Sequence, residues 1–411
     1  MNRRILFVPF GSEGDVNPLL WLAGLLADRG CQPVFLLTPH YAHLAAKRGF
    51  EWHPIGTEED FRRLAGDPSL WKPGLGTWRV ARAMHESLSS YKNAFDLAGG
   101  DFGLVVTSTL GLAASALAES RGIPRLMLHL QPMCVRSHGD MPVLTKGGDW
   151  FRQAPAILHD TAFLIVDGIL NRTMLPPVNR FRETLGLPRL NDFYRDALMR
   201  AEGVALLSPD WFSPLQPDWP KTLRQFDFPL SDTAPDPLPQ SLSAWLDAGG
   251  PPVLWTHGSA NVHLAKAWEL AHDVTQKIGG RALLIGRESP EFDLPGEIFY
   301  IPHVAFEGVL PRCRAIVHHG GIGTTSKAFA AGIPQLVIPL AHDQHDNAAR
   351  IERLKAGLQA KPHCRDAASK LRRIFSSAEI EAGVKRCKNL ARESPVKAAL
   401  LATWAEEIAG G

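Results

Sequence analysis

The sequence predicts an α/β protein with two domains, each built on a parallel β-sheet covered by helices. The chain has 411 residues, which is more than one ordinary domain holds. Short apolar runs alternate with helical runs in both halves, a pattern typical of parallel sheets covered on both faces. A segment rich in Pro and Asp, residues 230–240, separates the two series and is the best linker candidate.

The first half contains five apolar runs that predict strands and four runs of helix formers. The long stretch 150–200 lacks clear strand patterns and is expected to be helical. The expected strands are 4–10, 32–37, 104–108, 125–130 and 204–208, and the expected helices are 19–27, 41–47, 77–97 and 112–120.

The second half repeats the pattern with five further strands, each expected to be followed by a helical run. A helical tail over 399–408 ends the chain. We therefore expect an N-terminal domain over 1–230, a C-terminal domain over 231–395 and a C-terminal helix over 396–411. The expected strands are 253–256, 282–285, 298–301, 315–318 and 336–338.

Composition excludes several classes of protein. Lys and Arg number 44 against 42 Asp and Glu, so nothing indicates a nucleic-acid partner. Five scattered cysteines without a CxxC pair are typical of reduced thiols in the cytosol. The apolar stretch 5–10 is too short for a signal peptide or a membrane span. These features predict a cytoplasmic protein.

A Gly-rich turn, HHGGIGTT over residues 318–325, is the most informative motif in the chain. An apolar strand precedes it and a run of helix formers follows. The first amides of a helix lack partners and its dipole places positive charge there, so a phosphate fits without a metal. Glycines let phosphate oxygens approach the backbone, and Thr324 and Thr325 add hydroxyl donors. The competing explanation is a tight turn without a ligand.

Polar residues follow the next strand in the sequence. Gly332-Ile333-Pro334 closes the helix, and Asp343 and Gln344 fall just past the carboxyl end of the strand, at the edge where open α/β sheets bind ligands. An acid beside an amide suits the hydroxyls of a sugar. His342 and His345, with the neighbouring aspartates, could also be drawn as a metal site. Since a phosphate turn needs no metal, we expect none.

The first strand also ends in a glycine loop, Gly11-Ser12-Glu13-Gly14-Asp15, before a helical run. Carboxylates would stand where a pyrophosphate must lie, so this is not a dinucleotide fingerprint. A carboxylate displayed here suits proton abstraction, which makes Asp15 the candidate general base. The alternative is that Asp15 only caps the helix.

HHGGIGTT, AGIPQ and HDQ, in this order and spacing, resemble the donor-binding signature of family 1 glycosyltransferases. The resemblance implies the GT-B fold, with two Rossmann-like domains whose parallel sheets face a central cleft, and sugar transfer with inversion. It also implies a C-terminal helix that packs back on the first domain. The residues implied in diphosphate binding are His319 with the amides near Gly321, Gly323 and Thr324; those implied in sugar binding are Asp343 and Gln344.

Lys327 departs from the family pattern, because plant relatives have a glutamate there for the ribose hydroxyls. The loop GSEGDVNP resembles the GSxGDxxP loop of bacterial and sterol-type members, in which an Asp replaces the catalytic His of plant enzymes. This supports Asp15 as the base, on a donor loop formed by Gly11, Ser12 and Gly14.

Two further segments align with donor contacts in the family. Ser259, in the His-Gly-Ser that follows strand 253–256, would meet the diphosphate from the other side, or else belong to an ordinary turn. Val304 and Phe306 align with the segment that contacts the nucleobase, although the residues differ from the common pattern. The choice of base therefore stays open.

The first domain is rich in aromatic and Met residues outside regular strands, which suggests an apolar acceptor pocket. Core packing is the competing explanation for any one of them. Such loops also suit a peripheral contact with a membrane, at its inner face. The candidate acceptor-binding residues are Trp71, Trp78, Met84, His129 and Met133.

Three segments, 66–71, 211–220 and 341–348, are similar to rhamnosyltransferases of bacterial rhamnolipid synthesis. This implies a dTDP-L-rhamnose donor and a β-hydroxyalkanoyl lipid acceptor. Alternatives are transfer of UDP-glucose or another deoxysugar to a sterol, carotenoid or polyketide. A nucleotide-sugar 2-epimerase or an inactive helper protein would be a different class. Under each transferase hypothesis the nucleotide sugar is a co-substrate, and no cofactor is expected.

Overall fold

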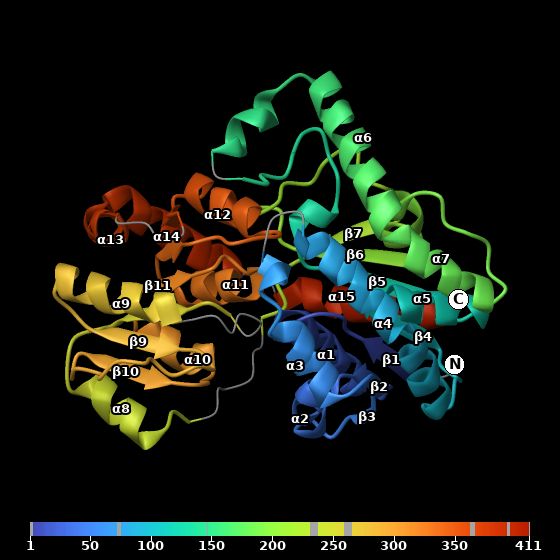
Figure 1. Cartoon of the computed structure of the whole chain (residues 1–411), viewed down its shortest axis with the longest axis horizontal. Coiled ribbons are helices and arrows are strands. Elements are labelled where there is room, and N and C mark those ends of the chain that lie inside the picture. The colour runs from blue at the N-terminus through green and yellow to red at the C-terminus, as the bar shows by residue number, and fades with distance from the viewer. Residues whose placement is uncertain are drawn as a thin grey trace. The chain divides into compact units, whose positions relative to one another are not determined.

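The computed structural model describes residues 3–71, 75–145, 147–230, 237–258, 265–361, 366–392 and 395–410. The chain forms two compact units (Figure 1). The first comprises Met1–Pro142, Trp150–Pro229 and Ser394–Gly411, and the second comprises Val143–Asp149 and Leu230–Glu393. Each unit is a parallel sheet with helices, which confirms the predicted fold class.

The first unit contains a seven-stranded parallel sheet in the order β3-β2-β1-β4-β5-β6-β7. The central strands are almost fully buried, as expected for a parallel sheet with helices on both faces. Its strands are β1 (Arg4–Val8), β2 (Gln32–Leu37), β3 (Glu51–Pro54), β4 (Leu104–Ser108), β5 (Arg125–His129), β6 (Gly203–Leu207) and β7 (Leu223–Phe226).

Eight α-helices accompany this sheet in the described part of the first unit. They are α1 (Glu13–Ala27), α2 (Ala42–Ala46), α3 (Glu58–Ala65), α4 (Leu75–Leu97), α5 (Leu112–Ser120), α6 (Ala156–Thr173), α7 (Leu175–Thr184) and α15 (Pro395–Gly410). Short 3-10 helices occupy Pro39–Tyr41, Pro68–Trp71, Pro132–Cys134 and Gly148–Gln153, and a π-helix occupies Phe193–Leu198.

The second unit contains a six-stranded parallel sheet in the order β10-β9-β8-β11-β12-β13. Its strands are β8 (Val253–Thr256), β9 (Ala282–Ile285), β10 (Ile298–Ile301), β11 (Ala315–His318), β12 (Gln335–Val337) and β13 (Gly357–Gln359). Its helices are α8 (Gln240–Asp247), α9 (Ala265–Ile278), α10 (Phe306–Val309), α11 (Ile322–Ala331), α12 (Gln344–Arg353), α13 (Ala367–Ser376) and α14 (Ala378–Arg392), with a 3-10 turn at Leu310–Arg312.

Both sheets have the strand order of a Rossmann-like fold. The order reverses between β1 and β4 in the first sheet and between β8 and β11 in the second. In open α/β sheets, ligands bind at the carboxyl ends of the strands, where the order reverses. The loops after β1, β8 and β11 are therefore the places to look for a site.

The structure adds strands that the sequence patterns missed. β3, β7 and β13 lie at sheet edges. β3 and β7 are partly exposed and need no continuous apolar run, and β13 has only three residues. Helix α1 begins at Glu13, six residues before the expected start, because Ser12 and Asp15 form a capping box. The described residues 286–297 between β9 and β10 contain no helix, unlike the expected helical run.

The C-terminal helix α15 contacts other elements of the first unit. Arg29 Nη1 donates to Thr403 Oγ1 and Glu406 Oε2, both at 2.9 Å. Lys397 Nζ lies 3.2 Å from Asp227 Oδ1. These contacts attach the last helix to the unit that contains β1.

Residues Val143–Asp149 group with the second unit, although the sequence placed the whole range 1–230 in the first domain. The Val143 amide donates to Asp346 Oδ1 at 3.1 Å, and Arg353 Nη1 lies 2.7 Å from Asp149 Oδ1. Asp346 also pairs with Arg350 at 2.8 Å, and both side chains are 1% exposed. A segment of the first half is thus hydrogen-bonded to α12, the helix that follows the Asp343-Gln344 pair.

Candidate active site

The N-terminus of α11 leaves three amides without partners. Gly321 is the N-cap, with φ −62° and ψ 139°, and no side chain caps the helix. The first intrahelical bond runs from the Thr325 amide to the Gly321 carbonyl at 3.0 Å. The amides of Ile322, Gly323 and Thr324 therefore have no acceptor among the described residues. Three free amides at the positive end of a helix dipole form an anion site.

His319 lies between two glycines beside these amides. A Cβ on Gly321 would lie 2.4 Å from His319 Nε2, and a Cβ on Gly258 would lie 2.5 Å from His319 Cε1. Gly258 also has φ +80°, a conformation that suits glycine. His319 Nδ1 has no hydrogen-bond partner among the described residues. Both glycines are therefore needed to hold the imidazole at the Gly-rich turn 318–325, called the phosphate turn below, and its Nδ1 is left without a partner among the described residues.

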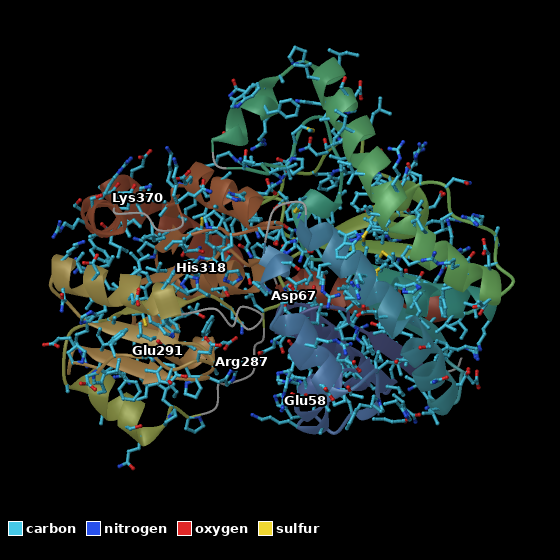
Figure 2. The ribbon with its side chains drawn as sticks, in the orientation of Figure 1. Glu58, Asp67, Arg287, Glu291, His318 and Lys370 are labelled. Carbon is cyan, nitrogen blue, oxygen red and sulfur yellow. The ribbon has the colours of Figure 1, made fainter. Side chains whose placement is uncertain are left out.

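His318 supports the turn from within the protein. It is fully buried at the end of β11 (Figure 2). Its Nε2 donates to Gln335 Oε1 at 2.9 Å, and its Nδ1 accepts from the Gly320 amide at 3.1 Å. Gly320 has φ +97°, and a Cβ there would lie 2.8 Å from Val337 Cγ1. His318 is thus a positioning residue that fixes the backbone of the turn.

His257 is a third imidazole at the same end of the sheet. It follows β8, the neighbour of β11, and its buried Nε2 has no partner among the described residues. Burial lowers the pKa of His257 and of His318 to about 4. Burial, with the two neighbouring imidazoles, lowers the pKa of His319 to about 3. All three rings are therefore neutral at pH 7 and able to donate an N–H.

Asp343 and Gln344 lie at the start of α12. Gln344 is 3% exposed, and its Oε1 accepts from the amides of Leu340 and Ala341 at 2.7 and 3.1 Å. Its Nε2 donates to no described group. Asp343 Oδ2 accepts from Asn347 Nδ2 at 2.8 Å, and the same Nδ2 lies 2.9 Å from the Gly320 carbonyl. Asn347 therefore links the acidic residue to the phosphate turn.

The remaining donor candidates differ in their surroundings. Thr324 is partly exposed, whereas Thr325 is fully buried, so burial turns its hydroxyl away from any surface. Ser259 lies outside the described residues. Val304 is 8% exposed and packs in the core of the second unit, while Phe306 is partly buried against that core. Thr325 and Val304 thus have core positions that the motif did not predict.

Lys327 lies one turn after Gly323 on α11. Its Nζ is 3.0 Å from Glu307 Oε1 and 5.7 Å from the centre of the Phe306 ring. A carboxylate is therefore present beside Lys327, on α10 and not on α11. Glu307 was not among the residues that the sequence singled out.

In the first unit, Asp15 closes the capping box of α1. Its Oδ2 accepts from the Ser12 amide at 2.8 Å and from Ser12 Oγ at 3.2 Å. A Cβ on Gly11 would lie 2.2 Å from that oxygen, and Gly11 has φ +131°, so only glycine fits there. Gly14 donates its amide to Ser12 Oγ at 3.2 Å. The capping alternative is therefore real, yet Asp15 Oδ1 accepts no bond from the described residues.

The surroundings of Asp15 suit proton transfer. Burial raises its pKa from 3.8 to about 6, against the lowering effect of the two bonds from Ser12. A carboxylate with a pKa near neutrality is a stronger base than an ordinary Asp and remains mostly ionised at pH 7. Asp15 thus combines a structural bond at one oxygen with a free, basic oxygen at the other.

Two of the five acceptor candidates, His129 and Met84, have core positions. His129 is fully buried, its Nε2 donates to the Leu198 carbonyl at 3.0 Å and its Nδ1 accepts from Thr109 Oγ1 at 3.1 Å. Met84 is 2% exposed in the core. Because both side chains are buried, neither presents a free group to an acceptor. The sequence alone did not show that they are buried. Met133 is partly exposed and Trp78 is 52% exposed. The side chain of Trp71 lies outside the described part.

Within the described ranges, no cluster of three or more His, Cys, Asp or Glu side chains could hold a metal. His345 Nδ1 instead accepts from Gln359 Nε2 at 3.2 Å. No helix in the described part is long and apolar enough to cross a bilayer.

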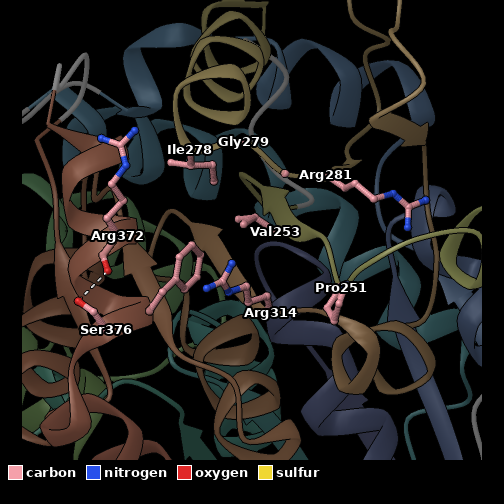
Figure 3. A pocket seen from close by; sticks show the side chains of 10 residues that line it. Pro251, Val253, Ile278, Gly279, Arg281, Arg314, Arg372 and Ser376 are labelled. Atoms are coloured by element: carbon pink, nitrogen blue, oxygen red, sulfur yellow. Dashed lines mark hydrogen bonds between the residues drawn. The ribbon is translucent and has the colours of Figure 1, made fainter.

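A cavity of about 310 Å³ in the second unit lies at the amino ends of the strands, at the other end of the sheet from the turn 318–325 (Figure 3). Its lining includes Pro251 and Val253 at the start of β8, and Arg281 and Arg314, which precede β9 and β11. The phosphate turn follows the carboxyl end of β11. This cavity is therefore separate from the candidate site.

Sequence reasoning gave no role to three residues of the candidate site, His257, Glu307 and Asn347. Asn347 lies four residues after Asp343, on the same face of a helix, and this spacing could have revealed it. The place of His257 beside the turn could not be predicted without knowing that β8 lies beside β11. The candidate site thus joins a helix N-terminus with free amides, neutral imidazoles and an acid beside an amide, groups that suit a transferase of phosphate-linked sugars.

Known proteins support this class. A family model described as Erythromycin biosynthesis protein CIII-like, C-terminal domain, matches residues 282–398. The chain is 28% identical over 371 residues to the vancomycin aglycone glucosyltransferase of Amycolatopsis orientalis, covering 86% of this chain and 85% of the relative. It is 27% identical over 369 residues to the dTDP-epi-vancosaminyltransferase of the same organism, with 86% and 85% covered.

Solved structures show the same fold. The glycotransferase of kitacinnamycin has a TM-score of 0.73 at 17% identity, with 98% of each chain covered. The Streptomyces sp. SF2575 glycosyltransferase SsfS6, complexed with thymidine diphosphate, has a TM-score of 0.68 at 17% identity, covering 98% of this chain and 99% of the other. The protein is therefore a glycosyltransferase with the GT-B fold, similar to family 1 enzymes.

Proposed function

We propose that this glycosyltransferase is inverting and metal-independent, and that it transfers L-rhamnose from dTDP-L-rhamnose to a hydroxyl of a hydrophobic acceptor such as a β-hydroxyalkanoyl lipid. The observation that carries the proposal is the phosphate turn, with three free amides of α11 beside the unused Nδ1 of His319. Asp343 and the free Nε2 of Gln344 supply hydroxyl contacts for the sugar.

In the proposed reaction, the acceptor oxygen forms a bond to the anomeric carbon while the bond from that carbon to the diphosphate oxygen breaks. Asp15 takes the proton from the acceptor hydroxyl. The leaving diphosphate gains negative charge, which the α11 amides and the neutral His319 stabilise by donating hydrogen bonds. His257 Nε2 is a further donor toward the same phosphate. No step requires a metal.

The relatives support a thymidine nucleotide but leave the sugar open. One relative is named a dTDP-epi-vancosaminyltransferase, and SsfS6 was solved with thymidine diphosphate. Another relative is a glucosyltransferase that acts on an aglycone, so transfer of UDP-glucose or another deoxysugar to a natural-product alcohol is the second candidate. We place the reaction in the cytoplasm, with a peripheral contact to the inner face of the membrane.

Thermal unfolding with dTDP, UDP and GDP side by side tests the donor. A ligand that binds only the folded state adds about 2.7 kcal/mol at a hundredfold excess over its Kd. The proposal expects the largest stabilisation with dTDP, followed by turnover of dTDP-rhamnose with a hydroxyacyl lipid. Preference for UDP would favour the glucosyltransferase. Donor turnover without any acceptor would favour an epimerase, and no response to any nucleotide would favour an inactive helper.

The ion pair of Glu307 and Lys327 is the proposed contact for the nucleotide's ribose. Lys327 lies one helical turn, about 5.4 Å, beyond the amides that are proposed to receive the phosphate. We expect Glu307→Gln to raise the Kd of UDP by about tenfold, since a hydrogen bond to a charged group contributes about 1.5–3 kcal/mol. The effect on dTDP should be smaller, because deoxyribose lacks the 2′-hydroxyl.

Isothermal calorimetry on the variant would measure both constants. Glu291→Gln is the matched control, because Glu291 is an exposed glutamate of the same unit with no ion-pair partner among the described residues (Figure 2). Equal Kd values for wild type and Glu307→Gln with both nucleotides would place the ribose elsewhere.

A further inference from the structure

Helix α6 presents an apolar face to the outside of the first unit. Its side chains Leu164, Ile165 and Ile157 are 73, 60 and 69% exposed, and Leu158 and Ile169 are also exposed. Five of the thirteen exposed large apolar residues in the described part of the chain belong to this one helix. Their spacing places them along one side of the helix. Exposed apolar side chains gathered on one side of a helix suit contact with an apolar partner or an interface.

The opposite side of α6 is firmly attached to the first unit. Asp167 accepts from Arg136 Nη1 at 2.6 Å, and the Arg136 guanidinium lies 5.0 Å from the centre of the Phe163 ring. His159 is 3% exposed and hydrogen-bonds the Phe151 carbonyl at 2.9 Å. The apolar face is therefore outward because the other face is anchored.

The polar side chains of α6 are occupied within the protein. Thr161 and Thr173 donate to the carbonyls four residues earlier, at 2.7 and 2.8 Å, a bond that removes the need for water. Asp160 pairs with His138 at 2.7 Å, and Asn171 Oδ1 accepts from the Phe193 amide at 2.7 Å. Transfer of this helix into an apolar phase would therefore leave few unsatisfied polar groups.

The apolar face of α6 alone is too small to form a stable interface with a second copy of the chain. An 18-residue helix is about 27 Å long and about 10 Å wide, so the stripe covers about 270 Å². A stable protein interface needs about 800 Å² per partner. The charge also favours lipid: Asp167 is paired with Arg136, and Asp160 is hydrogen-bonded to His138, whose pKa this bond raises. Arg172 at the end of the helix is exposed without a carboxylate partner in the described part.

We propose that α6 is a membrane-docking helix, which lies in the plane of an anionic lipid surface with its apolar face among the upper acyl chains. An interfacial helix buries such a face at the boundary between headgroups and chains, and anionic headgroups attract nearby arginines. The proposal names the surface for membrane contact and does not depend on which sugar is transferred.

Co-sedimentation with vesicles of equal parts phosphatidylglycerol and phosphatidylcholine tests the proposal. Wild type is expected to sediment with the vesicles, and the double variant L164E/I165E is expected to lose at least about tenfold in bound fraction. L97E is the matched control, because Leu97 is 71% exposed in the same unit but outside α6, and it should sediment like wild type.

Thermal unfolding and dTDP binding should be the same in all three proteins, because these side chains are exposed and lie outside the donor site. Failure of wild type to sediment, or undiminished sedimentation of L164E/I165E, would overturn the proposal. A wild-type dimer in light scattering that becomes a monomer in L164E/I165E would also overturn it, since α6 would then join two copies.

Discussion

Replacement of Asp15 by Asn is expected to lower kcat at pH 7 by about 10²- to 10⁴-fold, the usual contribution of general-base catalysis. Asn has no basic oxygen, but its carbonyl can still accept the hydrogen bonds that Ser12 donates to Asp15 Oδ2. The capping box, the fold and the binding of dTDP should therefore survive. Single-turnover kinetics with saturating donor would isolate the chemical step.

The pH dependence provides an independent readout of Asp15. Since burial raises its pKa to about 6, the rate should rise with pH with a midpoint near 6, and Asp15→Asn should lose this limb. The folded protein keeps this proton between pH 3.8 and about 6, where the unfolded chain has lost it. The contribution of Asp15 to stability is thus full below 3.8 and is lost as pH rises through about 6. In urea unfolding, Asp15→Asn should reduce the change in unfolding free energy between pH 3.8 and about 6.

Two neighbours provide controls for the same loop. Glu13→Gln removes the other carboxylate, whose Oε1 accepts from Asn17 at 3.2 Å, and should leave most of the rate. Ser12→Ala removes only the hydroxyl cap and should cost about 1 kcal/mol of stability. A rate for Asp15→Asn above roughly a tenth of wild type would show that Asp15 is only a cap. Loss of rate in Glu13→Gln alone would move the base to Glu13.

The buried parts of both sheets were predictable because parallel strands covered on both faces are continuous apolar runs. β2, β4, β8, β9 and β11 have the expected bounds, and so does β10, an edge strand that still forms an apolar run. Edge strand β3, with Glu51 and His53, carries no such run and was missed. The turn at 318–325 was predictable for another reason, since glycines between a strand and a helix specify both the backbone and its free amides.

Relations between distant segments were not predictable. Gly258 and Gly321 hold His319 from two different loops, and only the pairing of β8 with β11 brings those loops together. The ion pair of Lys327 and Glu307 likewise depends on the contact between α10 and α11. His129 was predicted to contact the acceptor but is fully buried. A histidine at a strand end has the same sequence pattern whether it is buried or faces a ligand.

Replacement of Gly323 by Ala is expected to raise the Kd of dTDP by about tenfold or more without lowering the stability of the free protein. No atom lies within 4 Å of a Cβ placed on Gly323, and its φ is not in the left-handed region. Ala is also favoured over Gly within a helix by about 1 kcal/mol. Any loss of affinity must therefore come from contact with the ligand, since a helical Cβ points toward the N-terminus, where we propose that the phosphate binds.

Gly321→Ala is the contrasting variant on the same turn. Its Cβ would lie 2.4 Å from His319 Nε2, so it must displace the imidazole and should lower both stability and dTDP affinity. Calorimetry for dTDP and urea unfolding for the free proteins would separate the two effects. Unchanged dTDP affinity in Gly323→Ala would remove the diphosphate from the N-terminus of α11, even if Gly321→Ala were inactive, because damage to His319 alone would then explain that inactivity.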